Sequence, residues 1–543
     1  MAPRNTLRLV PVKWRDAAVL AAACLFFLLA GQAFLPLIGT EDDESLFAGP
    51  LFSPLGAIYH YAFFQWHPPI MLMSYLGCLK TWLYAPLFGR FGTGVWTLRE
   101  PMLLAGAGSL CAFYFLLRRV AGVRAAALGT ILLAADACYL LTTCFDWGPV
   151  ALQHLLIVTA MLLVLRFAQD GGLLSLAAGC FLFGLAMWDK ALAMWMISGI
   201  GFAALAVYPR PVLRALRPRV LLVAAAAFAL GALPLILYNI HSNFDTFRGN
   251  SRRDVSELPK KASMLASTLR GHALFGYLAA EDWQTPSPHL LSGALDSAAS
   301  TVAAAAGQPR QNWMGYAFVL ALLLTPFAGA AAIRANAFAL IAMLLAWVEM
   351  ATTRNAGGSV HHSILLWPLP EWIVAVALAG VSRRSPRIGL AALSAFAALL
   401  AASELLVMDE YYVQMARNGG SGTWTDAIFA LETYAAAPHP PQNKPWREIY
   451  CVDWGVLDPL RMLSAGALPL SVGDLPGRDE FVRMISAPGH VFVTHTPELR
   501  NFPANDQKLE QFAAALGYSR KLLASVTDSY GRRTFEIYTF VAK

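Results

Sequence analysis

Four acidic residues, Glu41–Glu44, stand side by side directly after the first long apolar run of the chain. The nearest basic residues in the sequence, Arg15 and Lys80, lie far outside this row. A carboxylate beside a reacting hydroxyl can act as a general base, and carboxylates can also hold a divalent cation. A solvated acidic loop would have the same sequence, so the surrounding elements must decide between these interpretations.

The composition indicates a membrane protein with many helical spans. The chain has 543 residues, of which 57% are hydrophobic and 14% are charged, and its mean hydropathy is +0.51. A soluble globular protein carries about 25% charged residues. The long Ala- and Leu-rich runs exclude an outer-membrane barrel, whose strands would alternate over about ten residues. The net charge of +7 comes largely from short loops, so it does not indicate a nucleic-acid partner.

The distribution of Lys and Arg predicts the orientation of the spans. Basic residues before the first apolar run, Ala17–Ile38, place that end in the cytoplasm and the acidic row on the outer side. Four further basic loops should be cytoplasmic for the same reason. The basic residues are Arg4, Arg8, Lys13 and Arg15 at the start, then Arg118, Arg119 and Arg124, then Arg210, Arg214, Arg217 and Arg219, then Arg334, and finally Arg383, Arg384 and Arg387.

These charges require an odd number of crossings between the acidic row and Arg118. The stretch 69–88 contains Lys80 and several aromatic residues, which favours a helix lying in the membrane interface. About eleven spans then place every basic loop inside. They are expected at 17–38, 101–117, 125–143, 149–166, 173–188, 191–208, 220–239, 313–332, 336–351, 363–381 and 388–407.

We therefore expect a polytopic α-helical membrane protein with a soluble α/β domain at its C-terminal end. Residues 1–407 form the membrane domain, whose outer side carries the acidic loop 39–68 and a large loop at 240–312. Residues 408–543 form the outer domain. In it, β-rich runs at 448–452, 491–494 and 535–541 are combined with helical runs at 424–437 and 507–516.

The same topology gathers unusual polar residues on the outer side. Some of these residues have a purely structural interpretation when taken singly. Asp146 could cap the helix that Pro149 opens, and Asp189 with Lys190 could form a local ion pair. Charges near a bilayer are costly unless they are paired, exposed or functional. Together they indicate a site for an anion or a metal-bound phosphate. The set is Asp43, Glu44, Asp146, Asp189, Lys190, His241, Arg354, His361 and His362.

The order of six short motifs resembles the GT-C superfamily of membrane glycosyltransferases, especially the protein O-mannosyltransferases and the lipid A aminoarabinose transferases. Two positions depart from the family pattern: His67 stands where many relatives have Lys, and Ala191 stands where they have Gly. The motifs are Asp43-Glu44-Ser45-Leu46-Phe47-Ala48, His67-Pro68-Pro69, Leu98-Arg99-Glu100-Pro101, Phe145-Asp146, Trp188-Asp189-Lys190-Ala191 and the stretch from Ser359 to Pro370.

The resemblance implies an inverting transfer of a sugar from a polyprenyl-phosphate-linked donor. The acceptor would be an envelope lipid, glycan or protein at the outer face of the bacterial inner membrane. Asp43 is then expected as the base, with Glu44 and Asp146 as further catalytic residues. The donor phosphate would be bound by Lys190, Arg99, Arg354 and His67, and a divalent metal ion, if used, by Asp43, Asp146 and His362.

Two other classes of function are compatible with parts of the sequence. A transporter or flippase for a lipid or an anionic solute would need ionisable residues near the middle of the membrane and broken helices. The ionisable residues are instead expected at span ends, which disfavours a transporter. A non-catalytic assembly protein would use the C-terminal domain to bind partners.

Overall fold

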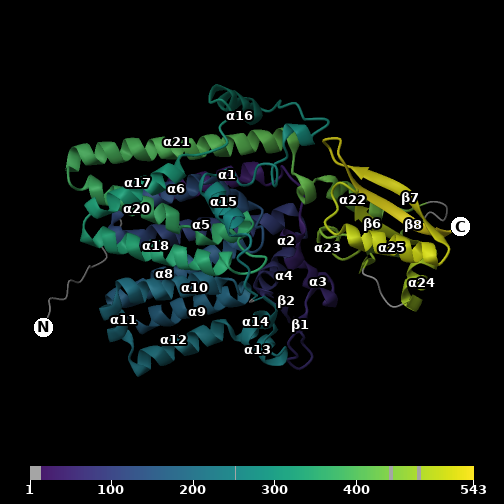
Figure 1. The fold of residues 1–543 in the computed structure, drawn as a ribbon, viewed down its shortest axis with the longest axis horizontal. Coiled ribbons are helices and arrows are strands. Elements are labelled where there is room, and N and C mark those ends of the chain that lie inside the picture. The colour runs from purple at the N-terminus through teal and green to yellow at the C-terminus, as the bar shows by residue number, and fades with distance from the viewer. Residues whose placement is uncertain (1–13, 251, 440–443, 474–477) are drawn as a thin grey trace.

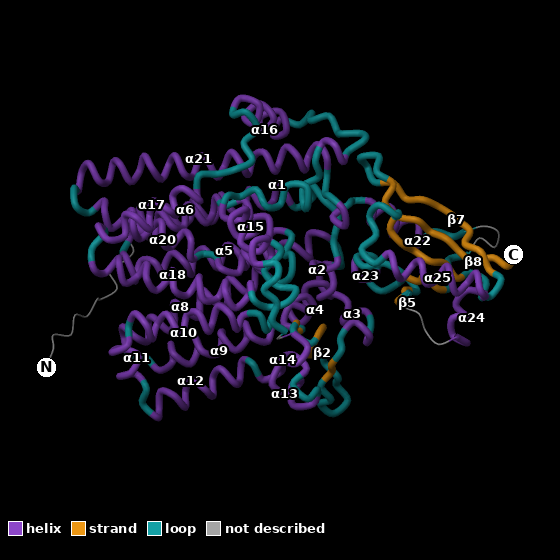
Figure 2. The backbone as a smooth tube through the Cα atoms, in the orientation of Figure 1, coloured by secondary structure: helices purple, strands orange, loops and turns teal. Residues whose placement is uncertain are grey.

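The computed structural model describes residues 14–250, 252–439, 444–473 and 478–543. Arg4, Arg8 and Lys13, which contribute to the predicted orientation, lie outside these residues. The long helices run side by side in one bundle, and a smaller domain that contains the larger sheet lies at one end of it (Figures 1 and 2).

The bundle has the helices that a membrane protein requires. Six helices of the described chain are long and apolar enough to cross a membrane, or up to nine if each of three bent pairs counts as one span. The six are α1 (Trp14–Phe34), α5 (Val95–Ala121), α8 (Val150–Asp170), α18 (Ala330–Ala351), α20 (Leu369–Ser382) with the short α19 (Val360–Ser363) before it, and α21 (Pro386–Asn418).

Three further predicted spans are bent in the structure, and two are short. The bent pairs are α6 (Val123–Ala135) with α7 (Ala137–Cys144), α10 (Ala193–Val207) with α11 (Pro209–Ala215), and α12 (Pro218–Gly231) with α13 (Leu233–His241). The short apolar helices are α9 (Leu173–Asp189) and α17 (Met314–Leu324). Each span expected from the sequence overlaps one of these helices or pairs.

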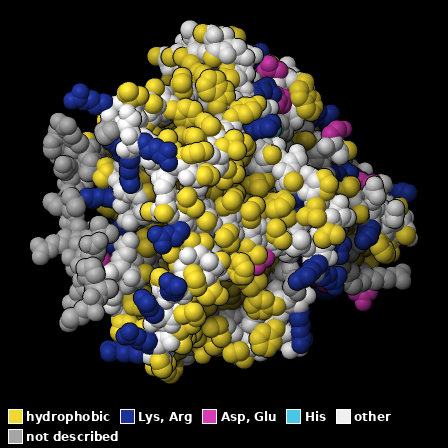
Figure 3. Space-filling view, turned by 60° about the vertical axis from the view of Figure 1, so that its left-hand side comes forward, with side chains coloured by type: hydrophobic (Ala, Val, Ile, Leu, Met, Phe, Trp, Pro, Cys, Tyr) yellow, Lys and Arg dark blue, Asp and Glu magenta, His cyan; other side chains and the backbone are white. Residues whose placement is uncertain are grey.

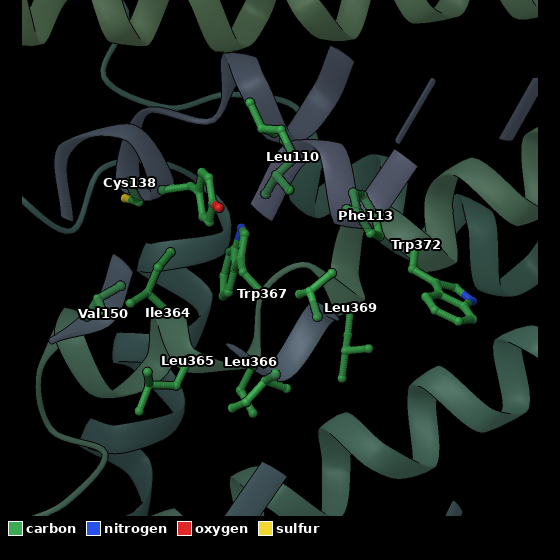
Figure 4. Close-up of a cluster of buried hydrophobic side chains, with 14 of the residues drawn as sticks. Leu110, Phe113, Cys138, Val150, Ile364, Leu365, Leu366, Trp367, Leu369 and Trp372 are labelled. Carbon is green, nitrogen blue, oxygen red and sulfur yellow. The ribbon is translucent and has the colours of Figure 1, made fainter. Parts of the chain in front are cut away.

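Large apolar side chains from distant helices meet in the centre of the bundle. Leu110 and Phe113 of α5 pack near Trp367 and Leu369, which lead into α20 (Figure 4). The Trp367 indole is buried, and its Nε1 donates to Asp136 at 3.0 Å. Hydrophobic side chains cover much of the surface seen in Figure 3, where Lys and Arg outnumber Asp and Glu. This pattern fits a bundle whose middle faces lipid and whose ends face water.

The stretch 69–88 differs from the single interfacial helix that the sequence predicts. It begins as a strand, β2 (Pro69–Met73), which pairs with β1 (Tyr59–His60) and β3 (Leu76–Gly77), and only then forms α4 (Leu79–Phe91). The reason is a tertiary contact. Trp188 Nε1 donates to the carbonyl of Ile70 at 2.9 Å, and a Cβ on Gly77 would lie 2.1 Å from the Trp188 carbonyl oxygen. Only glycine leaves room for the Trp188 backbone at position 77.

Short helices cover the end of the bundle nearest the C-terminal domain (Figure 1). The acidic row begins the helix α2, where the Glu41 side chain accepts the backbone N–H of Asp43 at 2.7 Å. The short elements are α2 (Asp42–Ser45), α3 (Gly49–Phe52), α14 (Asp245–Asn250), α15 (Leu258–Leu269) and α16 (Ala294–Ala305).

The C-terminal domain is a five-stranded sheet with helices on both faces. Its strand order is β5-β4-β6-β8-β7, with parallel pairing of β4 to β5 and β6 and antiparallel pairing of β8 to β6 and β7. Helices α22 and α23 pack on one face, and α24 and α25 on the other. The strands are β4 (Glu448–Cys451), β5 (Leu470–Val472), β6 (His490–His495), β7 (Tyr518–Thr527) and β8 (Arg533–Ala542), and the helices are α22 (Ala427–Ala436), α23 (Leu457–Leu463), α24 (Arg478–Ser486) and α25 (Pro503–Ala515).

The three strands and two helices predicted in this domain are confirmed. The sequence did not reveal β5 and β7, which form the two edges of the sheet. Edge strands bury only part of their side chains, so their sequences lack a clear alternation. The helix α21 continues to Asn418, so it carries the chain without a break past the domain boundary expected at residue 407.

Candidate active site

A cavity of about 560 Å³ opens at the end of the bundle that carries the acidic helix α2. Among the described residues that line it, the only carboxylate is Asp43, and the Lys and Arg side chains are Lys190, Arg252 and Arg354. This excess of positive charge favours an anionic ligand. The lining is Asp43, Leu46, Tyr75, Leu76, Gly148, Lys190, Leu192, Gly249, Asn250, Arg252, Thr353, Arg354, Asn355, Ala356, Ser359, His361 and His362.

Asp43 is held in this cavity by a tryptophan. The indole Nε1 of Trp147 donates to the Asp43 carboxylate at 3.1 Å. Burial raises the pKa of Asp43 above its ordinary value, although Lys190 and the Trp147 hydrogen bond oppose the shift. A carboxylate with a raised pKa and a fixed orientation is a stronger base than a free aspartate and is suited to accept a proton.

The turn that carries Trp147 also positions the main cation of the cavity. Asp146 and Gly148 both have positive φ angles, of 38° and 70°, and these shape the turn before α8. The carbonyl of Gly148 accepts a hydrogen bond from Lys190 Nζ at 3.1 Å. Burial lowers the pKa of Lys190 to about 8, while the neighbouring carboxylates Asp43 and Asp189 favour its charged form. One turn therefore contacts both Asp43 and Lys190.

Asp146 itself lies behind the cavity. Its carboxylate forms a buried ion pair with Lys80 of α4, and it accepts the backbone N–H of Ala151 at 3.0 Å, in the first turn of α8. These contacts match the helix-cap interpretation of Asp146. In the described structure, Asp146 therefore supports the turn and does not line the cavity.

Two arginines, Arg252 and Arg354, and two histidines, His361 and His362, also line the cavity. The backbone N–H of Arg354 donates to the carbonyl of Arg252 at 2.8 Å, which joins two segments that are distant in the sequence. His361 and His362 belong to α19, and the Nδ1 atom of each lies within hydrogen-bond distance of Ser359 Oγ, at 3.2 and 3.1 Å. The His361 ring packs edge-on against Trp147, with 4.4 Å between the ring centroids.

Three residues predicted for the site lie elsewhere. Arg99 donates both to the carboxylate of Glu44 and to the carbonyls of Leu35, Ile38 and Gly39. These contacts occupy all five N–H groups of its guanidinium, so none is free to bind a phosphate. Arg99 and Glu44 thus form a buried pair that ties the first outer loop to α5.

His67 is exposed in the loop between β1 and β2 and does not line the cavity. In the described part of the chain, no three His, Cys, Asp or Glu side chains are grouped so that they could hold a metal ion. Asp43, Asp146 and His362, which were predicted to bind a metal ion together, therefore do not form such a group.

The structure also adds residues to those predicted. Arg252 and Tyr75 line the cavity, and Trp147 donates to Asp43, although the motifs in the sequence singled out none of the three. Glu41 and Asp42 are both buried, so this part of the acidic row is not a solvated loop. The helix α23 of the C-terminal domain packs against α2 and covers them.

The hydrogen bond between Trp147 and Asp43 leads to a first prediction. Phenylalanine at position 147 keeps a ring that stacks on Tyr277 but removes the donor, so we expect kcat of any reaction based on Asp43 to fall by roughly tenfold to a hundredfold. Loss of this donor also raises the pKa of Asp43 further, so the acidic limb of the pH–rate profile should move to higher pH. Steady-state kinetics of Trp147→Phe across pH would measure both effects.

The exposed Trp283 provides a control, because Trp283→Phe removes an indole that is remote from the cavity. An unchanged acidic limb in Trp147→Phe would contradict the assigned role of Trp147.

Comparison with known proteins identifies the fold. No family model matches the chain, and no curated protein matches its sequence. Its structure is similar to that of ArnT from Cupriavidus metallidurans bound to undecaprenyl phosphate, with a TM-score of 0.54 and 14% identity over 96% of this chain and 98% of ArnT. It is also similar to the oligosaccharyltransferase of Archaeoglobus fulgidus in the apo form, with a TM-score of 0.51 and 12% identity over 94% of this chain and 70% of that protein. Both are GT-C membrane glycosyltransferases, and the chain described here has the GT-C fold.

Proposed function

We propose that this protein transfers a sugar from a polyprenyl-phosphate-linked donor to an envelope lipid, glycan or protein. The reaction takes place on the outer face of the bacterial plasma membrane, where the C-terminal domain also lies. The observation that carries this proposal is the cavity itself, which one oriented carboxylate, Asp43, lines together with Lys190, Arg252 and Arg354.

Each group in the cavity has a defined task in such a transfer. Asp43 accepts the proton of the acceptor hydroxyl while the hydroxyl oxygen attacks the anomeric carbon. The bond between that carbon and the phosphate oxygen breaks, and the lipid phosphate leaves with the bonding electrons. Lys190 and Arg354 stabilise the negative charge that develops on the phosphate. A single displacement of this kind inverts the configuration at the anomeric carbon.

The structural relatives support a lipid-phosphate donor. ArnT of Cupriavidus metallidurans has been solved with undecaprenyl phosphate, and its fold is shared with this chain. A donor carried by a lipid needs an apolar surface for its chain and a cationic site for its phosphate. The bundle offers the first, and the cavity offers the second.

Reconstitution tests this proposal directly. The purified protein in vesicles is supplied with a radiolabelled polyprenyl-phosphate sugar and with an envelope extract as the source of acceptor. Label that moves from the donor to a new product supports the proposal. Mass spectrometry of envelopes from cells with and without the protein then identifies the product that lacks one sugar. Absence of transfer with every envelope fraction would count against the proposal.

The acid–base groups of the cavity predict a bell-shaped dependence of activity on pH. Asp43 must be deprotonated to act as the base, and its raised pKa places the acidic limb above the value of about 3.9 for a free aspartate. Lys190 must be protonated to stabilise the phosphate, and its pKa of about 8 places the alkaline limb there. The rate therefore falls as the pH drops through the pKa of Asp43 and as it rises through the pKa of Lys190.

The variant Lys190→Arg tests the alkaline limb. Arginine stays charged throughout this range, so the limb should move to higher pH or disappear. An alkaline limb that stays near pH 8 in this variant would show that another group titrates there.

A transporter of lipids or anionic solutes is the second candidate, because the bundle contains buried acids beside broken helices. Asp136 lies at the 61° bend between α6 and α7, and Glu371 is buried in α20. Acids at such positions can form part of an ion pathway. The same vesicles separate the two functions, since solute or lipid flux without sugar transfer would favour the transporter.

A further inference from the structure

An exposed aromatic hairpin projects from the cavity end of the bundle. We use the name aromatic hairpin for residues 58–67, which include β1 and the loop that follows it. Phe64 is 89% exposed and Trp66 is 67% exposed, although both are large apolar side chains. The loop is well formed, because Phe63 and Trp66 exchange backbone hydrogen bonds of 2.8 and 3.0 Å. The aromatic rings are therefore displayed on an ordered turn.

The hairpin lies in a long segment without formal charge. Between Glu44 and Lys80 the sequence contains no Asp, Glu, Lys or Arg. A surface that faces water normally carries about 25–35% of these residues. An exposed apolar patch without charge marks a surface that binds a protein or a membrane.

The neighbours of the hairpin favour the membrane. At its base, the Tyr59 hydroxyl lies 3.2 Å from Nδ1 of His241, at the end of α13, and the Tyr59 ring packs on Tyr238. The helix α13 follows the membrane helix α12 after a bend of 71°, and Ile240 of α13 and Phe244 just after it are also exposed. Figure 1 places β1 beside α13 and α14. The apolar surface of the α12–α13 span thus continues onto the hairpin.

We propose that the aromatic hairpin inserts into the outer leaflet of the membrane, at the boundary between headgroups and acyl chains. Trp and Tyr prefer this depth, because their rings are apolar while their N–H and O–H groups can bind water or headgroups. The two phenylalanines at the tip add apolar area that is buried only if lipid covers them. The partner is therefore phospholipid and not another protein chain.

This position would connect the membrane surface with the cavity. The strand β2 leads from the hairpin to Ser74, which accepts hydrogen bonds from Thr246 and Asn250 of α14, at 2.5 and 3.0 Å. Tyr75 and Asn250 line the cavity. If the proposed function holds, the inserted hairpin marks the side from which a lipid-linked donor arrives; the insertion itself does not depend on that function.

Three phenylalanines with nearly equal exposure allow a matched test. Phe63 of the hairpin is 56% exposed, Phe202 of the membrane helix α10 is 57% exposed, and Phe512 of α25 in the C-terminal domain is 55% exposed. Each is replaced by cysteine and labelled with an environment-sensitive fluorophore in the full-length protein, which is reconstituted in phosphatidylcholine–phosphatidylglycerol vesicles. Unsubstituted protein, labelled in parallel, gives the background from the native cysteines.

Two quenchers then report the surroundings of each probe. We expect the Phe63→Cys probe to be quenched by lipids with a nitroxide near the headgroup, to resist aqueous iodide, and to emit at shorter wavelength than the Phe512→Cys probe. The Phe202→Cys probe should respond most to nitroxides deep in the acyl chains. Trp66→Cys is a second hairpin position and should behave like Phe63→Cys.

Two outcomes would overturn the proposal. In the first, iodide quenches both hairpin probes as strongly as the Phe512→Cys probe while lipid nitroxides have no effect, which means that the hairpin faces water. In the second, neither quencher reaches the hairpin and its emission changes with the ratio of protein to lipid, which means that a second copy of the protein covers it. Both readings are obtained without any sugar donor, so they are independent of catalysis.

Discussion

Replacement of Asp43 by asparagine should reduce sugar transfer by roughly 100- to 10,000-fold, the usual contribution of a general base. Asparagine has nearly the same shape, and its amide oxygen can still accept the hydrogen bond that Trp147 donates at 3.1 Å. It cannot take up the proton of the acceptor. The loss should therefore appear in kcat, with little change in the affinity for the donor. The transfer assay with labelled donor measures this directly.

A matched control separates loss of the base from loss of a charge elsewhere. Asp479 is an exposed acid in α24, outside the lining of the cavity, so Asp479→Asn should transfer at the rate of the unsubstituted protein. Transfer at the full rate by Asp43→Asn would remove the assigned role of Asp43. Glu44 could not replace it without leaving Arg99, because both oxygens of its carboxylate are bound there.

Replacement of Arg99 by methionine should cause the largest loss of stability, about 3–5 kcal/mol. The side chain is fully buried, and it holds the carboxylate of Glu44 together with three carbonyl groups of the first outer loop. Methionine fills part of the volume but leaves the Glu44 charge and these carbonyl oxygens without their donor. Unfolding of the reconstituted protein in increasing concentrations of denaturing detergent measures the loss.

A second substitution tests the cause of that loss. If the orphaned charge is responsible, Arg99→Met combined with Glu44→Gln should recover part of the stability. Arg90→Met is the matched control, because Arg90 lies exposed on α4 and a change there should be almost neutral. A double variant that is less stable than Arg99→Met would contradict this explanation.

The predicted topology and the motif order together singled out five residues that line the cavity: Asp43, Lys190, Arg354, His361 and His362. Spacing alone did not distinguish lining residues from supporting residues. Arg99 and Asp146 belong to the same motifs, yet the fold places Glu44 against the first and Lys80 against the second. Each of these contacts joins residues that are far apart in the chain, so no local pattern could reveal them.

The prediction of secondary structure likewise succeeded where local sequence decides and failed where a distant contact decides. Apolar runs predicted the helices of the bundle because burial in lipid demands an apolar run of a certain length. The strands between Pro69 and Gly77 were missed because a contact with Trp188 sets that backbone, and no local preference does. The role of Trp147 could not be read from the sequence for the same reason. Its partner, Asp43, is 104 residues away in the sequence.

In the proposed mechanism, one cavity binds the lipid phosphate through Lys190 and performs the transfer through Asp43. Native mass spectrometry with polyprenyl phosphate tests it most directly, by comparing the bound fraction in the unsubstituted protein, Lys190→Met and Asp43→Asn. We expect Asp43→Asn to bind the lipid as well as the unsubstituted protein does and Lys190→Met to lose most of the binding. Undiminished binding by Lys190→Met would contradict this mechanism.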